Sequence, residues 1–172
     1  MTRWILGAIV VVLGAALVVW NSARGGRSVS QKEPVRYSGI DFRAHRRASV
    51  ADYRGTPVLL TSWATWCVEC REELPSLVTF WESRRNHGLV VIAVNVDAPD
   101  ASRGIEAMVK KYSLAMPVWL DEANAYASAF GALGVPTSVL IDANGKVART
   151  WMGRIDFQSP AVANTVDATL IR

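Results

Sequence analysis

Cysteine and histidine are scarce in this chain of 172 residues, which contains only two of each. A structural zinc site commonly needs two cysteine pairs, or one pair and two histidines. The single pair is Cys67 and Cys70, whereas His45 and His87 are isolated from each other and from that pair. A structural zinc site is therefore not expected, and we interpret each histidine as an ordinary surface residue.

Acidic residues are absent before Glu33. This first part of the chain includes the unbroken apolar and small-residue run Trp4–Trp20, WILGAIVVVLGAALVVW. The run is at the short end of what crosses a bilayer as a helix, and a tryptophan stands at each end, as in the aromatic belts of membrane proteins. Asn21 fits the outer position of a signal-peptide cleavage site poorly. We therefore expect an uncleaved transmembrane anchor over residues 1–22 rather than a cleaved secretory signal.

Positive charge flanks the predicted anchor on both sides. Arg3 precedes it, while Arg24, Arg27 and Lys32 follow it. The positive-inside rule alone would place the body of the protein in the cytoplasm, but a long domain after a first apolar segment can be exported despite such charges. Charge counting therefore leaves the orientation open. Residues 23–34, which are polar and carry Gly, Ser and Pro, are interpreted as a linker.

The chain is basic, with a net charge of +4 and a sequence pI of about 9.4. The arginine-rich stretch after the linker lacks the interleaved aromatic residues on which bases would stack, so nucleic acid is not an expected partner. We interpret the positive charge as a solvated face or as an attraction to anionic lipid.

Apolar runs suited to strands alternate with helical patterns between residue 35 and residue 172, a length typical of one domain. Strands are expected at 58–63, 89–96, 117–120, 137–141 and 146–152, and helices directly after the cysteines and at 101–112, 122–130 and 160–171. This alternation predicts an α/β domain whose central, largely parallel sheet is covered by helices on both faces. The last two strands form a hairpin that adds an antiparallel edge, so the sheet is mixed.

The two cysteines stand three apart in the segment Trp63–Pro75, WATWCVECREELP. A disulfide between such close neighbours closes almost no loop and so adds little stability, and a domain of this size does not need a stabilising disulfide. The predicted strand ends near Trp63 and a helix begins near Cys67, where unpaired backbone N–H groups and the helix dipole favour a thiolate. Cys70 follows one turn later, within reach of the first sulfur. This arrangement predicts a redox pair in which Cys67 attacks a disulfide and Cys70 resolves the mixed disulfide.

The cysteine segment resembles the active site of thioredoxin-fold proteins, and in particular of the membrane-tethered TlpA/ResA/CcmG (DsbE) family. Asp41–Gly55 looks like the N-terminal extension of that family, the helix and strand between Val96 and Asp121 look like its central insertion, and Gly134–Asp142, GVPTSVLID, looks like its proline loop. The resemblance covers nearly all of residues 35–155. It implies a thioredoxin-like α/β fold with that extension and insertion, preceded by one transmembrane helix.

The resemblance also assigns substrate-binding positions. Pro136 matches the cis-proline that faces the dithiol and shapes the groove for the backbone of the substrate. Its neighbours Val135 and Thr137, together with Trp66 beside Cys67, are expected to contact the substrate.

A third catalytic residue is expected at Glu73, which matches an acidic residue near the dithiol in this family. One turn past Cys70, its carboxylate would accept the proton of Cys70. Thioredoxin carries a buried aspartate in the preceding strand, and Thr61 occupies that place here, which strengthens the prediction for Glu73. The residues between the cysteines, Val68 and Glu69, depart from the family pattern, which commonly has proline at the second position. This departure leaves the reduction potential open.

The implied function is that of an anchored thiol–disulfide oxidoreductase of the inner membrane, with its catalytic domain in the periplasm or extracytoplasmic space. It would reduce disulfides in targets such as apocytochrome c, receive electrons from a membrane donor of the DsbD/CcdA type, and act as a monomer without a metal or a cofactor beyond its redox-active disulfide.

Two alternatives remain. One is a module that binds Cu(I) or a partner protein through the dithiol. The other is a thiol peroxidase of the peroxiredoxin type. Such peroxidases place their cysteine in a Thr/Ser-x-x-Cys setting, and Thr65 is too close to Cys67 for that pattern.

Overall fold

The computed structural model describes residues 33–170. The predicted anchor over residues 1–22 and almost all of the predicted linker over residues 23–34 lie outside this range. Within it, no helix has both the length and the apolar character needed to cross a membrane. The elements are, in chain order, β1 (Ser38–Asp41), β2 (Arg46–Ser49), the 3-10 helix η1 (Val50–Tyr53), β3 (Val58–Trp63), α2 (Val68–Arg84), β4 (Val90–Asn95), α3 (Ser102–Lys111), β5 (Val118–Leu120), α4 (Ala125–Phe130), β6 (Thr137–Ile141), β7 (Val147–Met152) and α5 (Pro160–Leu170).

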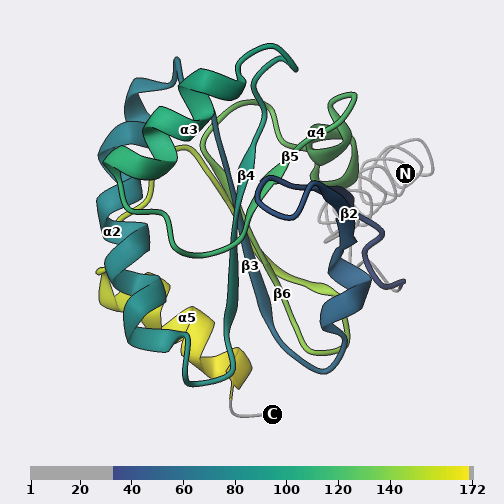
Figure 1. The fold of residues 1–172 in the computed structure, drawn as a ribbon. Helices are drawn as coiled ribbons and strands as arrows, with labels where there is room; N and C mark the ends of the chain where they lie inside the picture. The colour runs from purple at the N-terminus through teal and green to yellow at the C-terminus, as the bar shows by residue number, and fades with distance from the viewer. Residues whose placement is uncertain (1–32, 171–172) are drawn as a thin grey trace, which may run out of the picture. The chain divides into compact units, whose positions relative to one another are not determined.

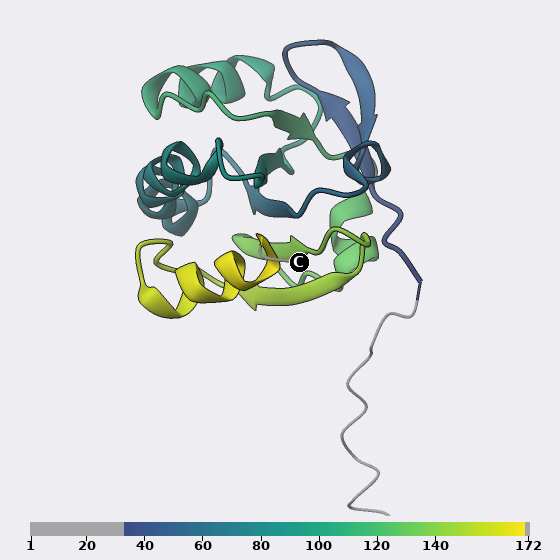
Figure 2. The same cartoon turned by 90° about the horizontal axis from the view of Figure 1, so that it is seen from below.

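The described part of the chain folds into three layers around one seven-stranded sheet, whose strand order is β2-β1-β5-β4-β3-β6-β7. Helices α2, α3 and α5 cover one face of the sheet and α4 covers the other, as seen in Figure 1 and, from below, in Figure 2. The predicted α/β fold with a mixed sheet and helices on both faces is therefore confirmed.

The expectation of a largely parallel sheet is wrong. Only the β3–β4 and β4–β5 pairs are parallel, whereas the other four pairings within residues 33–170 are antiparallel. One reason is a hairpin, β1–β2, that the sequence pattern did not predict and that joins the sheet beside β5. Its strands have four residues each, and β2 carries Arg46 and Arg47. Charged residues of this kind protect a sheet edge from unwanted pairing, but they erase the apolar alternation that marks a strand.

The central strands follow the sequence closely. Every residue of β3 is buried, and so is every residue of β4 after its first. Helix α4 begins three residues later than predicted, because Ala123 and Asn124 both adopt a positive φ, of 52° and 58°, which is incompatible with a right-handed helix. Gly131 ends this helix with φ 64°, directly after the predicted last residue, 130.

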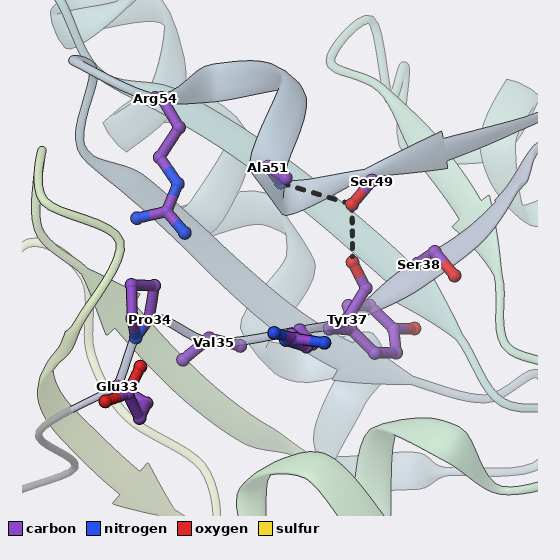
Figure 3. Close-up of a pocket in the computed structure, with 9 residues that line it drawn as sticks. Glu33, Pro34, Val35, Tyr37, Ser38, Ser49, Ala51 and Arg54 are labelled. Carbon is purple, nitrogen blue, oxygen red and sulfur yellow. Dashed lines mark hydrogen bonds between the residues drawn. The ribbon is translucent and has the colours of Figure 1, made fainter.

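The chain enters the described domain beside the turn between β6 and β7, where the N–H of Val35 donates to the carbonyl of Gly145 at 2.8 Å. Ser49 then fastens the entering segment, since its Oγ donates to the carbonyl of Tyr37 and accepts from the N–H of Ala51 (Figure 3). An open cavity of about 900 Å³ lies at this entry, lined by Glu33, Pro34, Val35, Arg36, Tyr37, Ser38, Ser49, Ala51 and Arg54. No residue of the candidate site described below lines it.

Candidate active site

Cys67 and Cys70 form a disulfide at the beginning of α2. Cys67 is the residue just before the first helical turn, with an extended backbone, and the N–H of Cys70 donates to its Sγ at 3.1 Å. After reduction, this N–H and the positive end of the helix dipole favour the thiolate form of Cys67. Cys67 is also the more exposed of the two, at 5% against 1% for Cys70. The geometry thus favours Cys67 as the attacking sulfur.

The loop before β6 meets the dithiol. The peptide bond between Val135 and Pro136 is cis, and the carbonyl oxygen of Val135 lies 3.8 Å from the Sγ of Cys67. The loop and the dithiol come together because β6 pairs with β3, the strand that leads into the cysteine segment. The backbone of Val135 therefore borders the sulfur that a substrate would reach.

Thr137 supports this loop from the interior. Its N–H donates to Ser62 Oγ, its Oγ1 donates to the carbonyl of Gly134, and its own carbonyl accepts from the hydroxyls of Ser62 and Tyr126. Only 1% of Thr137 is exposed. Contact between Thr137 and a substrate stays a prediction, while the role that the structure gives this residue is to hold the loop.

An apolar hollow of about 290 Å³ lies beside the dithiol, and we call it the loop groove. Its lining residues are Ser62, Trp66, Val96, Asn124, Tyr126, Ala127, Ala132, Leu133, Gly134 and Val135. Trp66 is 66% exposed and Leu133 is 91% exposed, which is unusual for such large apolar side chains. Leu133 is not among the predicted site residues, because an apolar residue within a loop carries no sequence signal that separates an exposed residue from a buried one.

Glu73 is buried, with 2% of its area exposed, although its neighbours Glu69 and Glu72 on the same helix are exposed. Its Oε2 accepts a hydrogen bond of 2.7 Å from the N–H of Ile155. Burial raises the pKa of Glu73 to about 7, although this hydrogen bond and the charge of Arg154 lower it. A carboxyl group with such a pKa can accept or release a proton near neutral pH.

Glu73 stands three residues after Cys70, and residues three apart on a helix are neighbours on its surface. Thr61, at the place of the buried aspartate of thioredoxin, instead shares a hydrogen bond with Ser138 inside the sheet. Glu73 is thus the buried carboxyl group that α2 places one turn from the dithiol.

Comparison with known proteins agrees with this geometry. The model of the AhpC/TSA family matches residues 40–150. The thiol-disulfide oxidoreductase ResA of Geobacillus thermodenitrificans is 34% identical over 116 residues, which are 67% of this chain and 64% of that protein. The ResA of Bacillus subtilis is 25% identical over 84% of this chain and 80% of that protein. The chain thus spans just under two thirds of the length of the first of these relatives.

Solved structures show the same fold. A structure from Chlorobium tepidum, described as a thiol:disulfide interchange protein DsbE, has a TM-score of 0.70 and 25% identity, and the match covers 80% of this chain and 98% of that one. A structure from Neisseria meningitidis, described as a thioredoxin, has a TM-score of 0.69 and 28% identity over 81% of this chain and 90% of that one.

Proposed function

We propose, from the premise that this chain belongs to the AhpC/TSA family, that it is a thiol–disulfide oxidoreductase that reduces disulfides in other proteins. The observation that carries the proposal is the Cys67–Cys70 pair, held at a helix N-terminus and bordered by the cis-proline loop. The relatives named thiol-disulfide oxidoreductase support it.

The reaction begins from the reduced pair. The thiolate of Cys67 attacks one sulfur of the target disulfide, so that the target S–S bond breaks, a mixed disulfide forms, and the released target thiolate takes up a proton. Cys70 then loses its proton to the Glu73 carboxylate and attacks the Sγ of Cys67. This step releases the second target sulfur as a thiolate, which takes up a proton, and leaves the Cys67–Cys70 disulfide that the structure contains. Two electrons pass from the pair to the target, and no cofactor takes part.

The loop groove would receive the target chain. A polypeptide lying along Val135 and Pro136 could place an apolar side chain, near its cysteine, between Trp66 and Leu133. Burial of one such side chain contributes about 1.5–3 kcal/mol to the free energy of binding the target chain. This is enough to favour unfolded or extended targets that expose apolar residues. Apocytochrome c is a target of this chemical class.

We propose that the protein acts at the outer side of the inner membrane, where residues 1–22 form the transmembrane anchor and residues 23–34 the linker. A membrane donor of the DsbD/CcdA type would return two electrons to the pair after each reaction. The protein would act as a monomer.

The peroxidase alternative is disfavoured by the surroundings of Cys67. The hydroxyl of Thr65 donates to Asp97 rather than to the cysteine, and the polar neighbours of Cys67 Sγ are backbone groups of Cys70 and Val135. Within residues 33–170, no group of three or more His, Cys, Asp or Glu side chains is placed to hold a metal ion.

A turnover assay tests the proposal. The chain, with dithiothreitol as the electron source, is mixed with a protein that contains an accessible disulfide, and free target thiols are counted with time. We expect multiple turnovers that require both Cys67 and Cys70. Reduction of hydrogen peroxide that survives Cys70→Ser would indicate the peroxidase instead, and stoichiometric Cu(I) binding without disulfide turnover would indicate the binding module.

A further inference from the structure

Thr65, two residues before Cys67, is held through every polar group that it has. Its N–H donates to Asp97 Oδ2 at 2.8 Å, and its hydroxyl donates to Asp97 Oδ1 at 3.0 Å. Its carbonyl accepts from the guanidinium of Arg71 at 3.0 Å. Both oxygens of one carboxylate therefore grip one residue of the cysteine segment, and hydrogen bonds to an ionised acceptor are about twice as strong as neutral ones.

Asp97 is itself held in position by Asn95, the last residue of β4. The side-chain N–H of Asn95 donates to Asp97 Oδ2 at 2.7 Å, and the N–H of Asp97 donates back to Asn95 Oδ1 at 3.1 Å. Asn95 is 1% exposed and pairs with Trp63, the last residue of β3. The position of the carboxylate is therefore fixed by the ends of two paired central strands.

Thr65 lies inside the turn that presents the attacking sulfur of Cys67. The N–H of Cys67 donates to the carbonyl of Ala64 at 3.2 Å, which closes a turn around Thr65 and Trp66. Trp66 is exposed and therefore adds little restraint. The orientation of Cys67, and with it the hydrogen bond from the N–H of Cys70 to its Sγ, depends on where Thr65 is fixed.

We propose that Asp97 is a positioning residue for Cys67, acting through Thr65 to hold the sulfur against the N–H of Cys70 and beside the carbonyl of Val135. The consequence for catalysis rests on the proposed function, because it matters only if Cys67 is the attacking group. Without the two hydrogen bonds between Thr65 and Asp97 the turn can move. The N–H of Cys70 then donates to the thiolate of Cys67 for a smaller fraction of the time.

The deciding test compares Thr65→Val with Thr65→Ser in the reduced full-length chain in detergent. Valine keeps the shape and charge but removes the hydroxyl donor, whereas serine keeps the donor. The rate of alkylation of Cys67 by iodoacetamide, followed by mass spectrometry across a range of pH, gives the apparent pKa of its thiol. Loss of one hydrogen bond in the turn should raise this pKa by about 0.5 to 1 in Thr65→Val. Thr65→Ser should restore the wild-type value to within about 0.2.

A second readout addresses Asp97 directly. Amide hydrogen exchange at Thr65 and Cys70 should accelerate about tenfold in Asp97→Ala, because the N–H of Thr65 loses its acceptor and Cys67 Sγ, the acceptor of the Cys70 N–H, is no longer held in position. The matched control is Asp100→Ala, which removes the same charge from an exposed carboxylate that forms no side-chain hydrogen bond with another described residue. If Asp97→Ala does not fold, the comparison at Thr65 decides alone.

The proposal is overturned if Thr65→Val and Thr65→Ser give the same pKa for Cys67 as the wild type. Alkylation needs no target disulfide, so this result is independent of the turnover assay. A chain that fails to reduce protein disulfides but shows the shift in Thr65→Val would refute the proposed function and leave the positioning role standing. The reverse combination would refute the positioning role alone.

Discussion

The backbone N–H of Cys70 lies 3.1 Å from the sulfur of Cys67, where it can stabilise the negative charge of the Cys67 thiolate once the disulfide is reduced. The two cysteines are therefore not equivalent. The asymmetry comes from the helix, because only the residue before the first turn can accept N–H groups that the helix itself leaves unpaired.

This asymmetry predicts opposite behaviour for the two single-cysteine variants. Cys70→Ser keeps the attacking thiolate and its backbone donor but cannot resolve, so it should accumulate a mixed disulfide with the target protein. Cys67→Ser should trap none, because it lacks the attacking sulfur. Non-reducing electrophoresis and mass spectrometry of the trapped species check both outcomes. Trapping by Cys67→Ser alone would reverse the assigned roles.

Glu73 gives a second prediction, on the resolving step. Glu73→Gln keeps an acceptor for the N–H of Ile155 but cannot take the proton of Cys70, so resolution should slow by about 10²-fold or more. The mixed disulfide should then become visible in rapid acid quenching of a single turnover. Glu72→Gln is the matched control, since it makes the same change on the exposed face of the same helix. Equal rates in the two variants would exclude the proton transfer.

The buried carboxyl group also makes stability depend on pH. Because the pKa of Glu73 is raised from 4.5 to about 7, the folded state keeps its proton between these values while the unfolded state loses it. The contribution of Glu73 to the free energy of unfolding is therefore fully present below pH 4.5. This contribution, on the order of 3 kcal/mol, is lost as the pH rises to about 7. Denaturant unfolding measures the free energy of unfolding at pH 5 and at pH 8. The difference between these two free energies should be smaller in Glu73→Gln than in Glu72→Gln. A difference of equal size would place the titration elsewhere.

Leu133 provides a prediction about target binding. Leu133→Ser removes an exposed apolar side chain from the loop groove, so the melting temperature should change little. The KM for an unfolded protein disulfide should rise roughly 5- to 30-fold, as expected for about 1–2 kcal/mol of lost contact. Turnover of oxidised glutathione, which is too small to need the groove, is the control. A KM for protein that stays unchanged would remove Leu133 from the binding surface.

The sequence predicted well those features that depend on local pattern. The wholly buried strand β3, the helix that follows Cys67 and the glycine that ends α4 each have a local physical cause. It did not predict the β1–β2 hairpin, because both strands are short and β2 begins with two arginines, so that neither strand shows apolar alternation. The fixation of Thr65 was missed for another reason. Thr65 and Asp97 meet only because β3 and β4 pair in parallel and end together, and no local pattern reports such a meeting.

The redox state of Cys67 and Cys70 in living cells decides whether the pair acts as a reductant. Cells that make the full-length protein are quenched with acid, free thiols are alkylated, and the two cysteines are resolved as dithiol or disulfide. For a reductant that is recharged at the membrane, we expect a mostly dithiol pool that turns to disulfide when the membrane electron donor is removed. A pool that is mostly disulfide in healthy cells would contradict a reductant, and would point to an oxidant or to a pair without a supply of electrons.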